Sequence, residues 1–186
     1  MINVNISEEN LKKVQIMMKK APDDVEMAAR NALNRTLISI RKEISVNIRK
    51  NYEIKAKDIK NALNLKHATS TSLTAEVKSY GSPRILQAFR VTMYKPSRKG
   101  YIKPPRARVL KTSNMKIVRG MFVNSKGYLS QRITKKRYPL RTPYGPSIPQ
   151  MMESKKVIDV IKIKAQDTLN NRFLHEIEYR FGKLGD

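Results

Sequence analysis

Four prolines within fourteen residues are the feature that most restricts how this chain can fold. Pro139, Pro143, Pro146 and Pro149 lie in residues 137–150. Each proline fixes φ and removes a backbone hydrogen-bond donor, so this segment can be neither a helix interior nor a central strand. We expect a stiff proline bridge that connects a strand region before it with a long helix after it.

The end of the proline bridge carries signals for a turn and for the start of a helix. Tyr144, Gly145 and Pro146 form a turn signal in which Gly145 is free to adopt a positive φ. Ser147 then precedes Ile148 and Pro149, so we expect its hydroxyl to cap a helix. Pro149 would lie in the first helical turn, where a missing N–H costs nothing.

Two long helices are predicted, one near each end of the chain. Apolar residues recur every three to four positions from Val25 to Ile48, which indicates a helix over residues 22–51, about 45 Å long at 1.5 Å per residue. A second stripe, at steps of four, begins at Val157 and predicts a C-terminal helix over residues 150–184. Shorter helices are expected over residues 7–20 and 54–63.

The period of the pattern changes after these N-terminal helices. Residues 73–80 alternate between apolar and polar side chains, which predicts a half-buried strand. Further strands are expected over residues 107–112, 116–124 and 128–134, with a hairpin at 125–127 between the last two. All seven glycines and eight of the nine prolines lie at or after position 81, which marks the change from helices to sheet and turns.

Together these patterns predict an α+β fold. We expect long N-terminal and C-terminal helices packed on a mainly antiparallel sheet, with a basic loop arm. The length of 186 residues fits a single domain. Its parts would be a helical part (1–65), a sheet part (66–136) with a mobile loop (95–107), the proline bridge (137–150) and the C-terminal helix (150–184).

Positive charge is concentrated in the middle of the chain. The net charge is +24, and residues 77–152 contain 18 Lys or Arg and no Asp or Glu. Such a region repels itself when isolated, so we expect an anionic partner, either DNA or an acidic protein face. The candidate contacts to a polyanion or a partner are the cations of the loop and those before the proline bridge: Arg98, Lys99, Lys103, Arg106, Lys135, Lys136 and Arg137.

Tyrosines interleave with these cations, at positions 94, 101, 128, 138 and 144. They fit stacking platforms for nucleic-acid bases. They also fit a role at strand ends or subunit contacts, which we favour because Tyr is common at interfaces. No sequence-reading DNA motif is present, so any nucleic-acid contact would be to phosphates.

The sequence offers little for catalysis. His67 and His175 have no acidic partner at a recognisable spacing, and no Gly-rich phosphate loop is present. The absence of cysteine excludes disulfides and thiol chemistry and fits synthesis in a reducing compartment. We therefore expect no enzyme, no cofactor and no bound metal. The start lacks a signal-peptide pattern and no apolar run is long enough for a membrane span, so we expect a soluble chain without membrane contact.

Three short runs are distinctive: ARNALNRT at 29–36, GMFV at 120–123 and YGPSIPQ at 144–150. Together they resemble phage and prophage minor tail protein Z, and the similarity is collinear over about residues 25–180. The Gly-Pro-Ser-Ile-Pro run is its most specific part, while residues 90–118 depart from the family pattern. We take the candidate assembly motif from this resemblance: Tyr144, Gly145, Pro146, Ser147, Ile148 and Pro149.

The resemblance implies a structural virion protein of a tailed phage or prophage-derived tail, made in the cytoplasm of the bacterial host. It would complete the head-proximal end of the tail as one subunit of a ring, commonly of six copies, and support head–tail joining and DNA passage. Its partners would be neighbouring copies, the tail tube or terminator, and connector proteins, with transient DNA contact. The alternative is a freestanding, nonspecific DNA-binding protein.

Overall fold

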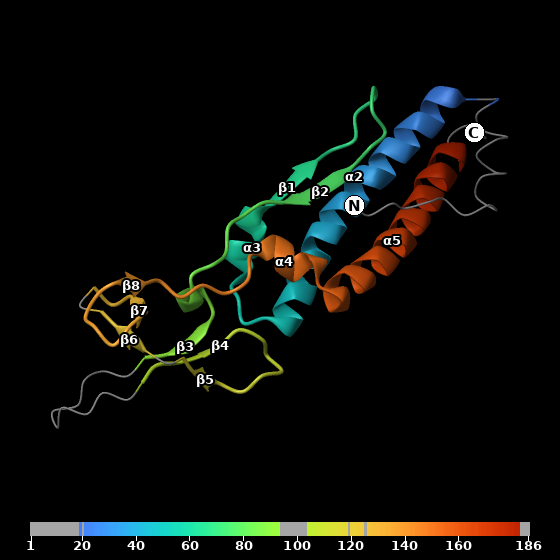
Figure 1. The fold of residues 1–186 in the computed structure, drawn as a ribbon. Coiled ribbons are helices and arrows are strands. Elements are labelled where there is room, and N and C mark those ends of the chain that lie inside the picture. Colours follow the sequence, from blue (N-terminus) through green and yellow to red (C-terminus); the bar gives the residue numbers. More distant parts are fainter. Residues whose placement is uncertain (1–18, 20, 94–103, 119, 125, 183–186) are drawn as a thin grey trace. The chain divides into compact units, whose positions relative to one another are not determined.

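The computed structural model describes residues 19, 21–93, 104–118, 120–124 and 126–182, and the fold is α+β, as predicted (Figure 1). Positions 7–18 and 20 of the first expected helix lie outside these residues. Positions 95–103 of the expected mobile loop also lie outside them. In the described part, two helices come first, a run of short antiparallel strands follows, and two helices end the chain.

The predicted helices that fall within the described residues are present, with small shifts in their ends. The helices are α2 (Pro22–Asn51), α3 (Ala56–Ala62), α4 (Ile148–Glu153) and α5 (Lys155–Gly182), with a 3-10 turn η1 (Leu86–Ala88). The helix over residues 22–51 is confirmed at both ends. The C-terminal helix begins two residues earlier than predicted and is divided at Ser154, whose carbonyl accepts the N–H groups of Val157 and Ile158 at 2.8 and 2.9 Å.

Within the described residues, the strands form three small antiparallel sheets. These are β1 (Leu63–Lys66) with β2 (Glu76–Ser79); β3 (Arg90–Thr92), β4 (Arg106–Arg108) and β5 (Lys116–Ile117); and β6 (Met121–Val123), β7 (Leu129–Arg132) and β8 (Leu140–Arg141). The predicted hairpin between β6 and β7 is confirmed by the pairing of Val123 with Leu129. The expected strand over residues 116–124 is divided between two sheets, and β1 was not predicted at all.

The chain divides into two compact units built from discontinuous segments. Unit 1 contains residues 1–47, 63–79 and 153–186, and unit 2 contains residues 48–62 and 80–152. Helix α2 contributes to both. The N-terminal and C-terminal helices therefore share unit 1 with the β1–β2 hairpin, whereas the other two sheets and the proline bridge belong to unit 2.

Unit 1 is built on the packing of α2 against α5, which lie side by side (Figure 1). Small residues of α2 and large residues of α5 form this core: Val25, Ala28, Ala32, Leu169, Phe173 and Ile177. Ala28 and Ala32 are completely buried. Because alanine adds so little bulk, the large side chains of α5 can approach the α2 backbone closely.

Ion pairs along the two helices fix their antiparallel register. The pairs are Asp24 with Arg180 (2.8 Å), Arg35 with Glu176 (2.7 Å) and Glu43 with Lys164 (2.7 Å). As the number rises along α2 it falls along α5, as antiparallel helices require. A slip by one turn would break all three pairs and displace the apolar core.

One asparagine attaches the β1–β2 hairpin to α2. Asn34 donates from Nδ2 to the Ala68 carbonyl at 3.1 Å and accepts the Ala68 N–H on Oδ1 at 2.8 Å. Its amide group thus satisfies both backbone polar groups of a buried residue in the loop after β1. Strand β2 lies within the alternating pattern of residues 73–80, as predicted.

Candidate assembly and polyanion-binding surface

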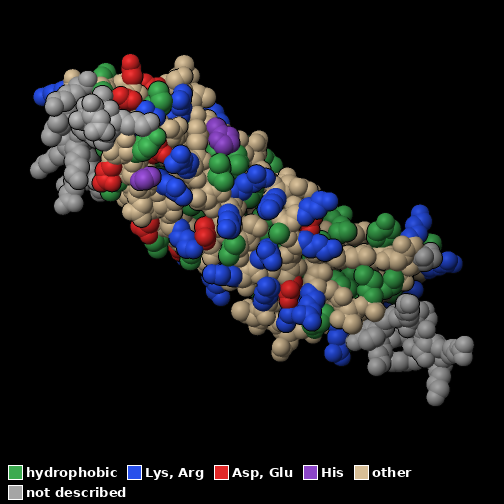
Figure 2. Space-filling model, turned by 180° about the vertical axis from the view of Figure 1, so that it is seen from behind, with side chains coloured by type: hydrophobic (Ala, Val, Ile, Leu, Met, Phe, Trp, Pro, Cys, Tyr) green, Lys and Arg blue, Asp and Glu red, His purple; other side chains and the backbone are tan. Residues whose placement is uncertain are grey.

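Unit 2 carries most of the positive charge. Its sequence has 22 Lys or Arg against two acids, Glu53 and Asp58, a net charge of +20. Unit 1 has 17 Lys or Arg against 13 acids, a net charge of +4. Lys and Arg side chains are widespread on the face shown in Figure 2, with few acidic side chains among them. The excess of cations predicted for the middle of the chain therefore belongs to one compact unit.

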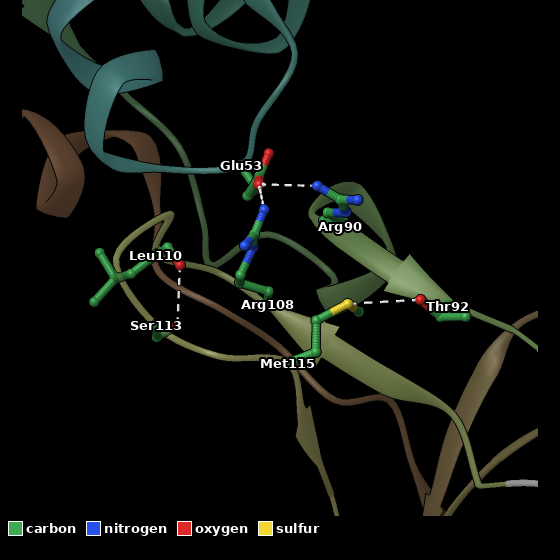
Figure 3. A network of polar contacts seen from close by, with 7 residues as sticks. All are labelled: Glu53, Arg90, Thr92, Arg108, Leu110, Ser113 and Met115. Atoms are coloured by element: carbon green, nitrogen blue, oxygen red, sulfur yellow. Dashed lines mark hydrogen bonds and ion pairs between the residues drawn. The ribbon is translucent and has the colours of Figure 1, made fainter.

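The two acids of unit 2 are both engaged by arginines. Asp58 Oδ1 lies 3.6 Å from Arg84 Nη2. Glu53 Oε1 contacts Arg108 Nη2 and lies 3.7 Å from Arg90 Nη1 (Figure 3). Because both carboxylates already pair with arginines, they do not neutralise the remaining cations of the unit.

Glu53 lies between two arginines that face each other across a sheet. Arg90 of β3 and Arg108 of β4 are directly paired in the antiparallel register. Like charges in directly opposite positions destabilise a sheet, and a shared carboxylate offsets that repulsion. The backbone places Glu53 there, because its N–H donates to the Val109 carbonyl at 2.9 Å. Sequence reasoning missed Glu53. The signal for it was that an acidic residue is rare in such a basic region.

The proline bridge is held by backbone hydrogen bonds to residues 84–89. The Leu86 N–H donates to the Pro143 carbonyl at 2.8 Å, and the Gly145 N–H donates to the Arg84 carbonyl at 2.8 Å. Between these bonds, Ile85 and Tyr144 form an isolated antiparallel bridge. The stiff segment that the prolines predicted is thus docked along another segment of unit 2.

The expectation that Gly145 adopts a positive φ is wrong. In the described residues the glycines with positive φ are Gly81, Gly120 and Gly127. Instead, a Cβ at position 145 would lie 2.6 Å from Cε2 of Phe89, a buried residue. Glycine is needed here because the bridge passes directly over an aromatic ring.

The predicted cap at Ser147 is confirmed, and it is reciprocal. Ser147 Oγ accepts the Gln150 N–H at 3.4 Å, while Gln150 Oε1 accepts the Ser147 N–H at 2.9 Å. This capping box starts α4, with Pro149 in the first turn. Sequence reasoning missed Gln150, although a glutamine three residues after a capping serine was the signal for it.

The candidate assembly motif is mostly turned inward. Ser147 and Ile148 are buried, and Gly145, Pro146 and Pro149 are partly buried. Tyr144 is 60% exposed, and its bridge partner Ile85 is 40% exposed. The buried members fix the backbone, so an outward contact from this motif would be made by the Tyr144 side chain, with Ile85 beside it.

The loop between β7 and β8 brings three of the predicted cations together. Lys135, Lys136 and Arg137 are all exposed within residues 133–139. The Arg137 guanidinium lies 5.6 Å from the centroid of the Tyr138 ring, and the Tyr138–Pro139 peptide bond is cis. This basic loop is the densest cluster of candidate polyanion contacts in the described part of unit 2.

The other candidate cations are not part of that loop. Arg106 is exposed on β4, in the β3-β4-β5 sheet, opposite Thr92 and Ile117. Arg98, Lys99 and Lys103 lie outside the described residues.

Among the described residues no group of three or more His, Asp or Glu could hold a metal ion. His67 and His175 are both exposed. Within the described part of the chain, no helix combines the length and apolar character that a membrane span needs.

Comparison of this sequence with known protein families gives one match. A family model described as prophage minor tail protein Z (GPZ) matches residues 8–182, nearly the whole chain, including both units and the proline bridge. No curated protein and no solved structure gives a match.

Proposed function

We propose, from the premise that this chain belongs to the prophage minor tail protein Z family, that it completes the head-proximal end of a phage tail as one subunit of a six-membered ring. Family membership makes it a phage minor tail protein and thus a virion-associated one. In the proposed role it supports head–tail joining and DNA passage, with the tail tube or terminator and the connector proteins as partners. The match over residues 8–182 is the observation that carries this proposal.

A ring subunit needs two different lateral surfaces, because heterologous contacts that repeat by rotation close into rings. The α2–α5 pair offers a stiff body for such contacts, since its register is fixed by a core and three ion pairs. Ile38 of α2 and Ile163 of α5 are both largely exposed. Exposed apolar side chains on a stiff helix pair favour lateral packing against a second copy.

The second proposed contact is Tyr144 with Ile85, in unit 2. Tyrosine is enriched at protein interfaces because it buries a large rigid area with few rotatable bonds. The two hydrogen bonds around the Ile85–Tyr144 bridge and the Phe89 packing hold this backbone in place before binding. Little conformational entropy would then be lost when a neighbouring subunit covers the pair.

The basic surface of unit 2 is compatible with this role in two ways. Most of the +20 charge would face acidic surfaces of neighbouring tail proteins, because a channel that bound DNA at many phosphates would slow its exit. A smaller number of cations would contact DNA transiently.

The proposal is tested by adding the purified chain to tails that were assembled without it. Negative-stain images and mass measurement should show a cap of six copies at one end of each tail. Tyr144→Ala should weaken capping, whereas Tyr128→Ala should not, because Tyr128 is a similarly exposed tyrosine of unit 2 outside the motif. Tails that remain uncapped at saturating wild-type protein would overturn the proposal.

The charge of unit 2 also favours a second candidate function, a freestanding nonspecific DNA-binding protein. This candidate predicts tight binding of the isolated chain to duplex DNA at physiological salt, with no association with tails. Weak, salt-sensitive DNA binding together with stoichiometric capping of tails would exclude it.

A further inference from the structure

We infer that the β7–β8 loop, residues 133–139, binds the phosphate backbone of duplex DNA, and that Lys135, Lys136 and Arg137 make the contacts. The inference deepens the proposed function, on which it depends only for the presence of DNA beside this surface. It separates the few cations that meet DNA from the many that would meet protein.

The first observation is that the three cations form no ion pair with an acid in the part of the chain that the structure describes. Unit 2 has two acids, and both are engaged elsewhere: Glu53 by Arg90 and Arg108, and Asp58 by Arg84. Among the described residues, none of the three loop cations forms an ion pair with a carboxylate, and all three are exposed. An external anion would relieve their mutual repulsion.

The second observation is that the loop is anchored at its base. The pairs Gln131–Arg141 and Arg132–Leu140 close it, and Arg141 Nε donates to Gln131 Oε1 at 2.8 Å. Within the loop, the Lys136 N–H donates to Thr134 Oγ1 at 3.2 Å. A short anchored loop loses little entropy on binding, so even a small number of phosphate contacts gives measurable affinity.

The side-chain types favour DNA over an acidic protein face. Lysine is depleted at protein interfaces, whereas lysine and arginine supply most phosphate contacts on nucleic acids. Arg137 stacks on Tyr138, so the ring supports the guanidinium on one face. Contacts of this kind carry no sequence information, which suits a protein past which an entire genome must move.

The number of contacts suits passage as well as binding. Each neutralised phosphate on B-DNA contributes about −0.9 to the slope of log K against log salt, so three contacts contribute about −2.7. At physiological salt such a site is weak and rapidly reversible. It would orient a DNA end without arresting the rest of the molecule.

The test is the salt dependence of binding to a fluorescently labelled random-sequence duplex, measured by anisotropy with the full chain. The loop variant is Lys135→Ala/Lys136→Ala/Arg137→Ala. The matched control is Lys155→Ala/Lys156→Ala/Lys162→Ala, which removes the same charge from exposed positions of α5 in unit 1. Circular dichroism checks that both variants are folded.

The loop variant should reduce the magnitude of the salt slope by about 2.7, and the control should leave it at the wild-type value. The ratio of wild-type to loop-variant affinity should then rise roughly 40-fold between 200 and 50 mM salt. A wild-type slope in the loop variant, or an equal reduction in both variants, would overturn the inference.

A separate measurement distinguishes DNA from an acidic protein partner. If the loop variant fails to cap DNA-free tails while its DNA salt slope stays at the wild-type value, the loop contacts protein and the inference is wrong. The anisotropy assay requires no tails, so failure of the ring proposal and failure of this inference give different results.

Discussion

Gly145 lies so close to the ring of Phe89 that no side chain fits between them. A Cβ at position 145 would stand 2.6 Å from Cε2, 3.1 Å from Cζ and 3.2 Å from Cδ2 of that ring. Phe89 is buried, so its ring cannot turn aside into solvent. The close approach allows the backbone of residues 143–145 to bond with residues 84–86 and to present Tyr144 outward.

Gly145→Ala should therefore destabilise the protein although alanine is compatible with the backbone φ. Overpacking a buried site commonly costs about 1–3 kcal/mol, and we expect a loss in this range in the free energy of unfolding, measured with urea. Tail capping should weaken in parallel, because the Ile85–Tyr144 bridge would be displaced.

A double-mutant cycle isolates this contact. Phe89→Leu removes the ring atoms that a Cβ at position 145 would meet, at the cost of a cavity. In the Phe89→Leu background, Gly145→Ala should cost less than it does in the wild type. If the two changes are simply additive, the ring is not the reason for glycine at this position.

Glu53→Gln should destabilise unit 2 by leaving Arg90 and Arg108 opposite each other without a shared carboxylate. Hydrogen bonds to charged groups contribute about 1.5–3 kcal/mol, and partial exposure of Arg90 lowers this toward about 1–2 kcal/mol. The loss should be smaller at high salt, which screens the repulsion between the two arginines. Urea unfolding at two salt concentrations measures both effects.

Two further variants control for the loss of a carboxylate. Asp58→Asn removes the other acid of unit 2, whose pair with Arg84 is long and partly exposed, so it should cost less than about 1 kcal/mol. Adding Arg90→Gln to Glu53→Gln should restore part of the stability. Equal losses for Glu53→Gln and Asp58→Asn would show that the opposed arginines are unimportant.

Ser147→Ala should cost about 1 kcal/mol, because it removes the side-chain acceptor at the start of α4. The reciprocal bond from the Ser147 N–H to Gln150 predicts coupling between the two positions. The loss in the double variant Ser147→Ala/Gln150→Ala, measured by urea unfolding, should be smaller than the sum of the single losses. Strict additivity would mean that the two bonds act independently.

The helices and the proline bridge could be predicted because their causes are local. Apolar spacing along α2 and the missing donors of four prolines act within a few residues of the positions concerned. The four-residue strand β1 directly follows α3, and its apolar–polar alternation is too short to separate it from the end of a helix, so its pairing with β2 reveals it. Long-range partners were equally hidden: Phe89 lies 56 positions before Gly145, and Arg108 lies 55 after Glu53.

The charged contacts between α2 and α5 in unit 1 are also long-range and could not be predicted from the sequence. Apolar stripes predicted both helices, but the register between them depends on which charged residues meet across their interface. Glu176 is only 4% exposed, so its ion pair with Arg35 could not be inferred from its place on the helix alone. Glu178, two positions further along α5, is exposed, so the two carboxylates lie on different faces of the helix.

Arg35→Ala should destabilise unit 1 more than the loss of an ordinary surface ion pair. The substitution removes the ion pair of the buried Glu176 carboxylate with Arg35. The carboxylate keeps its contact with Asn31 Nδ2 of α2, at 3.5 Å. Removing one partner of a fully buried pair costs about 3–5 kcal/mol, but the Arg35 side chain is 54% exposed, so we expect about 1–3 kcal/mol by urea unfolding.

Lys164→Ala is the matched control, because it removes the more exposed pair with Glu43 from the same two helices and should cost less than about 1 kcal/mol. Replacing both members of this pair, as Arg35→Leu/Glu176→Leu, should recover stability, because it leaves no buried charge at position 176. If Arg35→Ala costs no more than Lys164→Ala, water reaches the Glu176 carboxylate, and the helix register depends on the apolar core alone.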